Sequence, residues 1–364
     1  MSLLTLHVLR LFVLRLTALL LVISGLVWIV DLFEMSRRVA GKPGVGIGDV
    51  VLATVLKSPA QAHDYLHLIV FLAAALTFWQ LVRMQEFIAA SAAGASPWRL
   101  LLPLGGGAAL FGILWIALIS PWGALGHQAY ERLRTEMLGE RPGHVLDLFD
   151  SGIWLRQYLP SGAALTLHAP GRKPDTGIVL APIMVLEIGP QQNFVRRMDA
   201  QSAELLDGHW HLTDVVTTYA NNQQRRAKEV LISTSLTAQT IEESFLAPRS
   251  LGFWRLPGFI DVLEGNGFSH VSYQLHYQRL VAMPLSLVAM VFLAGGLFLR
   301  HHRQRHAAWP IAIGVGASFF VFVLTSFLAA LATTGTVSPL IAMWTPPSIV
   351  LFGSASLIVY LEDG

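Results

Sequence analysis

The strongest constraint on the fold of this chain is the distribution of its apolar segments. A bilayer core about 30 Å thick requires ~20 apolar residues in a helix that crosses it. Three long apolar stretches lie in the first third of the chain and three in the last quarter, with a long polar segment between them. They are Leu11–Phe33, Leu66–Met84, Leu100–Trp122, Leu280–Leu299, Trp309–Leu331 and Leu340–Tyr360. We therefore predict an integral membrane protein with six transmembrane α-helices in a 3+3 arrangement and one large inserted domain.

The composition agrees with a membrane protein and excludes several classes of function. Hydrophobic residues make up 54% of the chain and charged residues 13%, against about 25% charged in a typical soluble domain. The net charge of +2 is too small for a nucleic-acid-binding protein. The absence of cysteine excludes disulfides and thiolate catalysis. The first apolar stretch exceeds the length of a signal peptide's apolar core and lacks a small-residue cleavage site, so we expect an uncleaved first span.

The basic residues predict the orientation, because short cytoplasmic loops carry an excess of Lys and Arg. Arg300–His306, between the fourth and fifth spans, is the most basic loop, and Arg83 and Arg99 flank the loop after the second span. Both termini are then cytoplasmic, and the middle domain faces away from the cytoplasm. The expected parts are residues 1–123 with three spans, 124–271 as a periplasmic domain, and 272–364 with three more spans. Four basic residues break the rule, since we expect them in the outer loop between the first two spans: Arg37, Arg38, Lys42 and Lys57.

The middle domain has the pattern of an antiparallel β-protein. Short runs that mix apolar and polar residues are separated by turn residues, which is typical of a sandwich or an open barrel. Asp207-Gly208, flanked by apolar residues, is the strongest hairpin signal. A helix-like segment, Leu256–Leu263, precedes the fourth span. The expected strands are Ile153–Tyr158, Ala164–His168, Gly177–Leu186, Asn193–Ala200, Gly208–Asp214 and Glu229–Leu236.

No motif for catalysis, a cofactor or a metal is present in the sequence. Gly41–Gly46 lacks the spacing and the hydroxyl residue of a phosphate-binding loop, and no zinc-protease or serine-hydrolase motif occurs. His301, His302 and His306 could bind a metal, although a solvated part of a basic loop is the simpler interpretation. The fourth to sixth apolar stretches hold no ionisable residue between their ends, so a proton-coupled or ion-conducting pathway is disfavoured. Energy for transport would then come from another polypeptide, and the chain itself is not predicted to be an enzyme.

The loop after the second span predicts a short amphipathic helix, at about residues 84–97, parallel to the membrane. It is rich in alanine, Gly94 could end the helix, and Ser96-Pro97 could start the next one. One interpretation is a docking helix for a cytoplasmic motor, with Glu86 as its charged contact. The alternative is a plain connecting turn in which Glu86 is solvated.

Four arginines form a second candidate site, on the outer side of the membrane. Arg37 and Arg38 follow the first span, and Arg132 and Arg134 follow the third. Arginine forks bind phosphate with two parallel hydrogen bonds, so these residues are candidates for holding an anionic lipid. The alternative is interfacial snorkelling, or pairing with nearby acidic residues, namely Glu34, Glu131 and Glu136.

The order of spans and domain resembles the LptF/LptG family of permeases, which export lipopolysaccharide from the inner membrane of double-membraned bacteria. The resemblance covers essentially the whole chain, and several stretches look like the LptG branch. They are Val30–Arg38, Glu86 with Gly94, Gly152–Arg156, Asp207–Leu212, Tyr273–His276, Pro284–Ser286 and Pro346-Pro347.

This resemblance implies more than the residues alone. The outer domain would be a periplasmic β-jellyroll, and the chain would form a heterodimer with an LptF-like permease on two copies of an LptB-like ATPase. An LptC-like bitopic protein and a periplasmic LptA-like bridge would be further partners, without a cofactor. Glu86, Gly94 and Arg83 would belong to the ATPase-coupling helix. Arg37 and Arg38, and more weakly Arg132 and Arg134, would hold phosphates of lipopolysaccharide.

Two other classes of function compete with transport. A membrane scaffold whose outer β-domain binds partner proteins would have the same architecture but no ATPase subunit. An intramembrane enzyme is disfavoured, because the apolar stretches hold no polar residues at depth. Copurification with a nucleotide-binding subunit would distinguish a permease from a scaffold.

Overall fold

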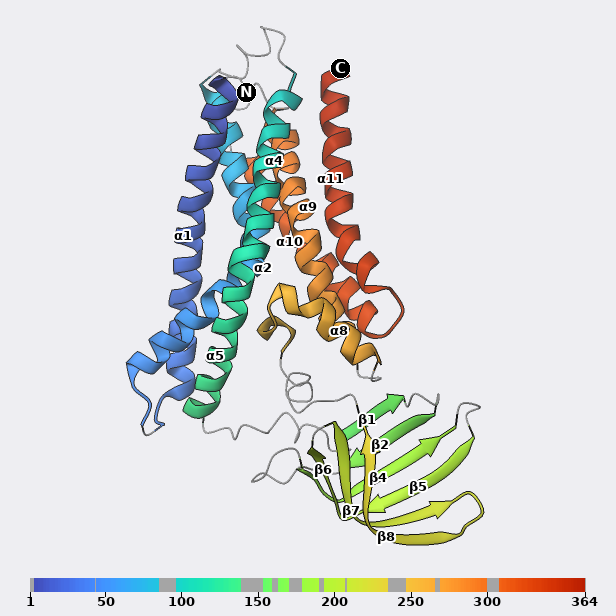
Figure 1. Cartoon of the computed structure of the whole chain (residues 1–364). Helices are drawn as coiled ribbons and strands as arrows, with labels where there is room; N and C mark the ends of the chain where they lie inside the picture. The colour runs from blue at the N-terminus through green and yellow to red at the C-terminus, as the bar shows by residue number, and fades with distance from the viewer. Residues whose placement is uncertain are drawn as a thin grey trace. The chain divides into compact units, whose positions relative to one another are not determined.

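The computed structural model describes residues 3–42, 44–84, 96–138, 153–158, 163–169, 179–189, 193–206, 208–234, 247–265, 269–299 and 308–363. The chain divides into two compact units. The first contains residues 1–134, 249–254 and 271–364, and the second contains residues 135–248 and 255–270. The first unit is a helix bundle, and the second contains an antiparallel sheet (Figure 1).

The bundle contains six helices that are long and apolar enough to cross a membrane, so the prediction of six spans is confirmed. The third consists of α4 and α5 joined by a π-helical turn, η1. Figure 1 shows both termini at the same end of the bundle, as an even number of spans requires. The helices are α1 (Leu3–Val39), α2 (Ile47–Arg83), α4 (Trp98–Leu114), η1 (Trp115–Ile119), α5 (Ser120–Leu138), α9 (Val271–Leu299), α10 (Ala308–Thr333) and α11 (Pro339–Asp363).

Several helices extend beyond the apolar stretches. Helix α2 has 37 residues, which at 1.5 Å per residue is about 55 Å, well over the ~30 Å of a hydrocarbon core. Its start is fixed locally, because the carboxylate of Asp49 accepts a hydrogen bond from the Gly46 amide at 2.9 Å and so caps the first turn. At the end of α1, Gly41 has a φ of +84°, which favours glycine and lets the chain leave the helix.

These longer helices correct two sequence-based expectations. Arg37 and Arg38 lie in the last turn of α1, and Lys57 lies inside α2, so three of the four basic residues expected in a loop are helical. Helix α9 begins at Val271 and not at Leu280, so it includes His276 and Arg279. The apolar stretch of the fourth span thus holds no ionisable residue between its ends, whereas the helix that contains it does. The helix can continue past the hydrocarbon boundary because it satisfies its own backbone hydrogen bonds on either side of that boundary.

The helices differ in how far the bundle covers them. In the most apolar window of each helix, 61% of residues are buried in α9, but only 17% in α10 and 6% in α1. Helix α9 therefore lies at the centre, whereas α1 and α10 present apolar faces outward. The core includes fully buried side chains from α1, α2 and α4, among them Phe12, Phe71, Phe78, Leu101 and Leu104.

Two pairs of glycines bring the third span close to α9 and to α2. A Cβ atom on Gly105 or Gly112, in α4, would lie 3.1 Å from atoms of α9. A Cβ atom on Gly126, in α5, would lie 2.5 Å from the backbone oxygen of Leu56 in α2, and one on Gly123 would lie 3.2 Å from the Ala60 amide. The π-helical turn separates the two pairs of glycines.

The second unit contains an eight-stranded sheet in which all strand pairs are antiparallel. The strand order is β1-β2-β4-β5-β7-β6-β3, and β8 also pairs with β7. Trp210, Leu165, Leu167 and Met198 are fully buried in its core. The strands are β1 (Ile153–Tyr158), β2 (Ala164–Ala169), β3 (Val179–Leu180), β4 (Ile183–Ile188), β5 (Phe194–Ala200), β6 (Ser202–Leu206), β7 (His209–Tyr219) and β8 (Gln224–Ser233); helix α8 (Leu256–Gly265) follows.

The prediction of an inserted antiparallel β-domain is confirmed, with changes at individual strands. Strands β6 and β7 pair on either side of the predicted hairpin turn, with Leu206 opposite His209; Asp207 itself lies outside the described residues. The strand expected over Gly177–Leu186 is divided into β3 and β4, because Ala181 and Pro182 form a bend between them, and proline lacks the amide that a ladder needs. Strand β6 was not among the expected strands.

Candidate functional site

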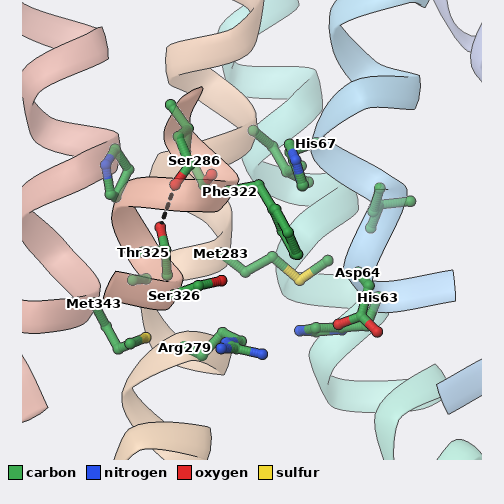
Figure 2. A pocket seen from close by; sticks show the side chains of 15 residues that line it. His63, Asp64, His67, Arg279, Met283, Ser286, Phe322, Thr325, Ser326 and Met343 are labelled. Carbon is green, nitrogen blue, oxygen red and sulfur yellow. Dashed lines mark hydrogen bonds between the residues drawn. The ribbon is translucent and has the colours of Figure 1, made fainter. Parts of the chain in front are cut away.

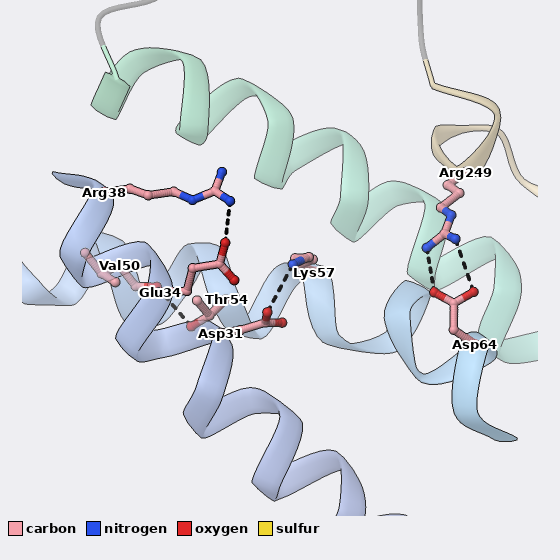
Figure 3. A network of polar contacts seen from close by, with 8 residues as sticks. All are labelled: Asp31, Glu34, Arg38, Val50, Thr54, Lys57, Asp64 and Arg249. Carbon is pink, nitrogen blue, oxygen red and sulfur yellow. Dashed lines mark hydrogen bonds and ion pairs between the residues drawn. The ribbon is translucent and has the colours of Figure 1, made fainter. Parts of the chain in front are cut away.

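Charged side chains gather where α1 ends and α2 begins (Figure 3). The ammonium group of Lys57 lies 3.2 Å from a carboxylate oxygen of Asp31, whose side chain is 12% exposed. The same nitrogen lies 5.8 Å from the ring centre of Tyr130 in α5, within range of a cation–π interaction. Lys57 therefore connects three helices, and its charge is already balanced by Asp31.

The four candidate phosphate-binding arginines differ in their partners. Arg38 pairs with Glu34 one helical turn earlier (Figure 3), and Arg134 pairs with Glu131 at 3.0 Å. Arg37 and Arg132 are exposed, and neither forms an ion pair or hydrogen bond within the described part of the chain. Pairing thus occupies one arginine in the last turn of α1 and one in the second half of α5, and the other arginine of each helix remains available to an external anion.

The candidate coupling residues are only partly described. Arg83 is the last residue of α2, and its guanidinium group lies 5.5 Å from the ring centre of Trp79. Glu86 and Gly94 lie outside the described residues. The next helix, α4, begins at Trp98 with Pro97 as its cap residue, as Ser96-Pro97 indicated. The role of these residues in coupling stays a prediction.

The structure shows an ion pair that the sequence did not indicate. Arg249 donates two hydrogen bonds to the carboxylate of Asp64 in α2, at 2.8 and 3.1 Å (Figure 3). The two-fold contact matches the planar guanidinium to the carboxylate. The side chains of Arg249 and Asp64 are 41% and 33% exposed, so the pair lies at the edge of the bundle.

The segment from Arg249 to Trp254 is bound to the bundle at three further points. Gln128 of α5 donates a hydrogen bond to the Ser250 carbonyl at 2.8 Å, and the Trp254 indole donates one to the Ala117 carbonyl at 3.4 Å. The ring of Phe253 stacks on that of Tyr277 in α9, with centres 5.6 Å apart. The sequence carries no local signal for these contacts, because each joins residues that are distant in the chain.

No group of three or more His, Asp or Glu side chains that could hold a metal ion occurs among the described residues. His301, His302 and His306 lie outside the part that the structure describes.

Comparison with known proteins gives two matches. The family model described as "Lipopolysaccharide export system permease LptF/LptG" matches residues 6–360. The chain is similar to the lipopolysaccharide export system permease protein LptG of Haemophilus influenzae, with 23% identity over 329 residues, which cover 85% of this chain and 85% of that protein.

Proposed function

Because the chain belongs to the LptF/LptG family of lipopolysaccharide export permeases, we propose that it is the LptG-like subunit of an ATP-driven transporter. In this role it extracts lipopolysaccharide from the inner membrane and passes it to a periplasmic bridge. The observation that carries the proposal is the extent of the family match, which includes all six helices and the inserted sheet domain. The similarity to an LptG protein favours the LptG branch.

The uncovered faces of α1 and α10 support a pairing with an LptF-like permease. Large apolar side chains are well exposed there, including Leu21 (69%) and Phe33 (73%) in α1 and Phe319 (66%) in α10. Such a surface suits acyl chains or the helices of a partner. We place a lateral opening between the first and fifth spans of paired subunits, with an apolar cavity that receives the lipid tails.

Arg37 and Arg132 are the best candidates in this chain for the phosphates of the lipid. Both are exposed, Arg37 beside the paired Arg38 in the last turn of α1 and Arg132 near the paired Arg134 in the second half of α5. A bidentate arginine–phosphate contact is stronger than a neutral hydrogen bond. The unpaired arginines would therefore hold the head of the lipid while its tails occupy the apolar cavity.

Extraction needs an external energy source. Each methylene group moved out of the membrane costs about 0.8 kcal/mol, so several acyl chains together cost tens of kcal/mol. The sequence has no phosphate-binding loop for ATP. We therefore assign ATP hydrolysis to two copies of an LptB-like ATPase, bound through the connector that contains Glu86 and Gly94 and follows Arg83.

The proposed orientation places both termini in the cytoplasm and the sheet domain in the periplasm, where an LptC-like protein and an LptA-like bridge receive the lipid. The chain has no cysteine, so single introduced cysteines report the topology directly. Asn221→Cys, in the exposed turn between β7 and β8, should react with a membrane-impermeant maleimide added outside spheroplasts. His7→Cys, exposed near the start of α1, should react only after the membrane is opened. The reverse pattern would refute this orientation.

Reconstitution tests the function. The chain should copurify with an LptF-like permease and an LptB-like ATPase, and proteoliposomes of the complex should transfer lipopolysaccharide to an LptA-like acceptor only with hydrolysable ATP. A scaffold would copurify without a nucleotide-binding subunit. Transfer that proceeds equally without ATP would contradict the proposal.

A further inference from the structure

A small cavity lies inside the helix bundle, and none of the four outer arginines of α1 and α5 lines it. Its volume is about 100 Å³, and residues of α2, α9, α10 and α11 line it (Figure 2). One part of its wall is polar, with His63 and Asp64 from α2 and Arg279 from α9. The hydroxyl side chains of Ser286, Thr325 and Ser326 also line it. Met283, Phe322 and Met343 contribute apolar surface.

The polar part of this cavity has an excess of positive charge. Arg249 occupies both carboxylate oxygens of Asp64. Arg279, which is only partly exposed, forms no ion pair or hydrogen bond with any described residue. Nε2 of His63 is buried and also lacks a partner among the described residues. A partly buried cation without a partner is costly, so the cavity is suited to an anion.

The wall also supplies neutral hydrogen-bond donors. Ser286 and Ser326 form no hydrogen bond within the described chain, whereas the Thr325 hydroxyl donates to the Val321 carbonyl at 2.8 Å. A guanidinium fork with two free hydroxyls is the donor set that a tetrahedral phosphate uses. A volume of about 100 Å³ is well above the ~10–15 Å³ that one water molecule needs, so the cavity has room for a phosphate group.

The depth of the cavity in the bundle indicates where the phosphate comes from. Asp64 precedes the last residue of α2, Arg83, by 19 residues, and Arg279 precedes the last residue of α9, Leu299, by 20 residues. At 1.5 Å per residue both distances are close to the ~30 Å thickness of a hydrocarbon core. The two residues therefore lie at the level of lipid headgroups when Arg83 and Leu299 lie at the opposite membrane surface.

We propose that this cavity binds the phosphate group of a membrane lipid within a single permease subunit. Arg279 provides the charge, Ser286 and Ser326 provide hydrogen bonds, and the acyl chains lie against the exposed apolar face of α10, which includes Phe319 and Phe322. The site is distinct from the proposed contacts at Arg37 and Arg132, and it does not depend on lipopolysaccharide being the transported substrate.

Native mass spectrometry of the full-length chain in dodecyl maltoside tests the proposal. Delipidated protein is titrated separately with phosphatidylglycerol, with lipopolysaccharide and with inorganic phosphate. We expect a saturable adduct of one lipid molecule, and Arg279→Gln should weaken it by about tenfold or more, as expected for the loss of a charged hydrogen bond. The lipid that binds more tightly identifies the source of the phosphate. Binding of inorganic phosphate with neither lipid bound would overturn the assignment to a lipid.

Two further variants keep the test decisive. Arg99→Gln removes the same charge from an exposed position near the start of α4, and it should leave the adduct unchanged. Ser286→Leu fills the cavity but keeps Arg279, and it should weaken lipid binding as strongly as Arg279→Gln. If Arg279→Gln does not fold, Ser286→Leu alone tests whether the cavity binds the lipid. Equal binding by the wild type and Ser286→Leu, or an equal loss in Arg99→Gln, would refute the proposal.

Discussion

Arg249 holds both carboxylate oxygens of Asp64, at 2.8 and 3.1 Å, although 185 residues separate the two in the chain. Arg249 lies in the segment through which the chain returns from the sheet domain to the fourth span. Asp64 lies in α2, and the connector with the candidate ATPase-coupling residues follows the last residue of that helix, Arg83. The ion pair thus provides a physical link through which a displacement of α2 would act on the return segment.

The first prediction concerns the strength of this link. A double-mutant cycle with Asp64→Asn and Arg249→Gln should give a coupling free energy of about 1 kcal/mol, because the pair is bidentate but partly exposed. The measurement is unfolding of the purified full-length chain in mixed micelles with increasing dodecyl sulfate. Glu34→Gln with Arg38→Gln is the matched control, a pair within one exposed helix turn, and its coupling should stay below about 0.5 kcal/mol. Equal coupling in the two cycles would contradict a specific anchor.

The second prediction separates the four outer arginines. Arg37→Ala and Arg132→Ala should each reduce photo-crosslinking to lipopolysaccharide several-fold, because their guanidinium groups have no ion-pair partner in the described chain. Arg38→Ala and Arg134→Ala should have a smaller effect, since Glu34 and Glu131 already bind those groups. An unaltered crosslinking yield in Arg37→Ala and Arg132→Ala would contradict phosphate binding and would favour interfacial snorkelling of these side chains.

The third prediction concerns contact with the ATPase. Glu86→Arg should reduce copurification of the LptB-like subunit and ATP turnover in the complex at least about tenfold, because a charge reversal replaces attraction by repulsion at the interface. Glu264→Arg, at an exposed position in α8, makes the same change in charge and should leave both measurements unchanged. If Glu86→Arg assembles and hydrolyses ATP normally, the connector is not the docking site.

The fourth prediction tests how α10 is packed. A Cβ atom on Gly314 would lie 1.7 Å from Cζ of Phe71 in α2, which is fully buried, whereas one on Gly316 would meet nothing within 4 Å. Gly314→Ala should therefore lower the free energy of unfolding by about 1–3 kcal/mol, and Gly316→Ala should leave it nearly unchanged. Phe71→Leu should rescue Gly314→Ala in part. Equal stability of the two alanine variants would show that α2 and α10 are not in this contact.

The sequence predicted the spans well but not where the helices begin. Hydrophobic length is a local property, so the stretch from Leu280 to Leu299 identifies a span without tertiary information. The start of α9 at Val271 is not visible in hydropathy, because the added turns are polar. They remain helical through their own backbone hydrogen bonds, and this extension brought His276 and Arg279 into the span.

In the candidate sites, too, local sequence features could be recognised but contacts between distant residues could not. The sequence drew attention to all four outer arginines, and the structure shows acidic partners for Arg38 and Arg134; a role of any of the four in binding phosphate stays a prediction. Asp64 was missed because its partner, Arg249, is distant in the sequence and nothing near either residue indicates the other. Such a contact depends on the path of the whole chain around the inserted domain, so local patterns cannot reveal it.

The π-helical turn at Trp115–Ile119 acts as a rotational offset within the third span. One residue inserted into an α-helix turns everything that follows by about 100° around its axis. Gly105 and Gly112, before the turn, can then face α9 while Gly123 and Gly126, after it, face α2, so one continuous span packs against two helices that lie in different directions. Removing one residue from the turn, and so restoring plain α-helix, would point Gly126 away from Leu56 and leave α2 without its closest neighbour in the third span.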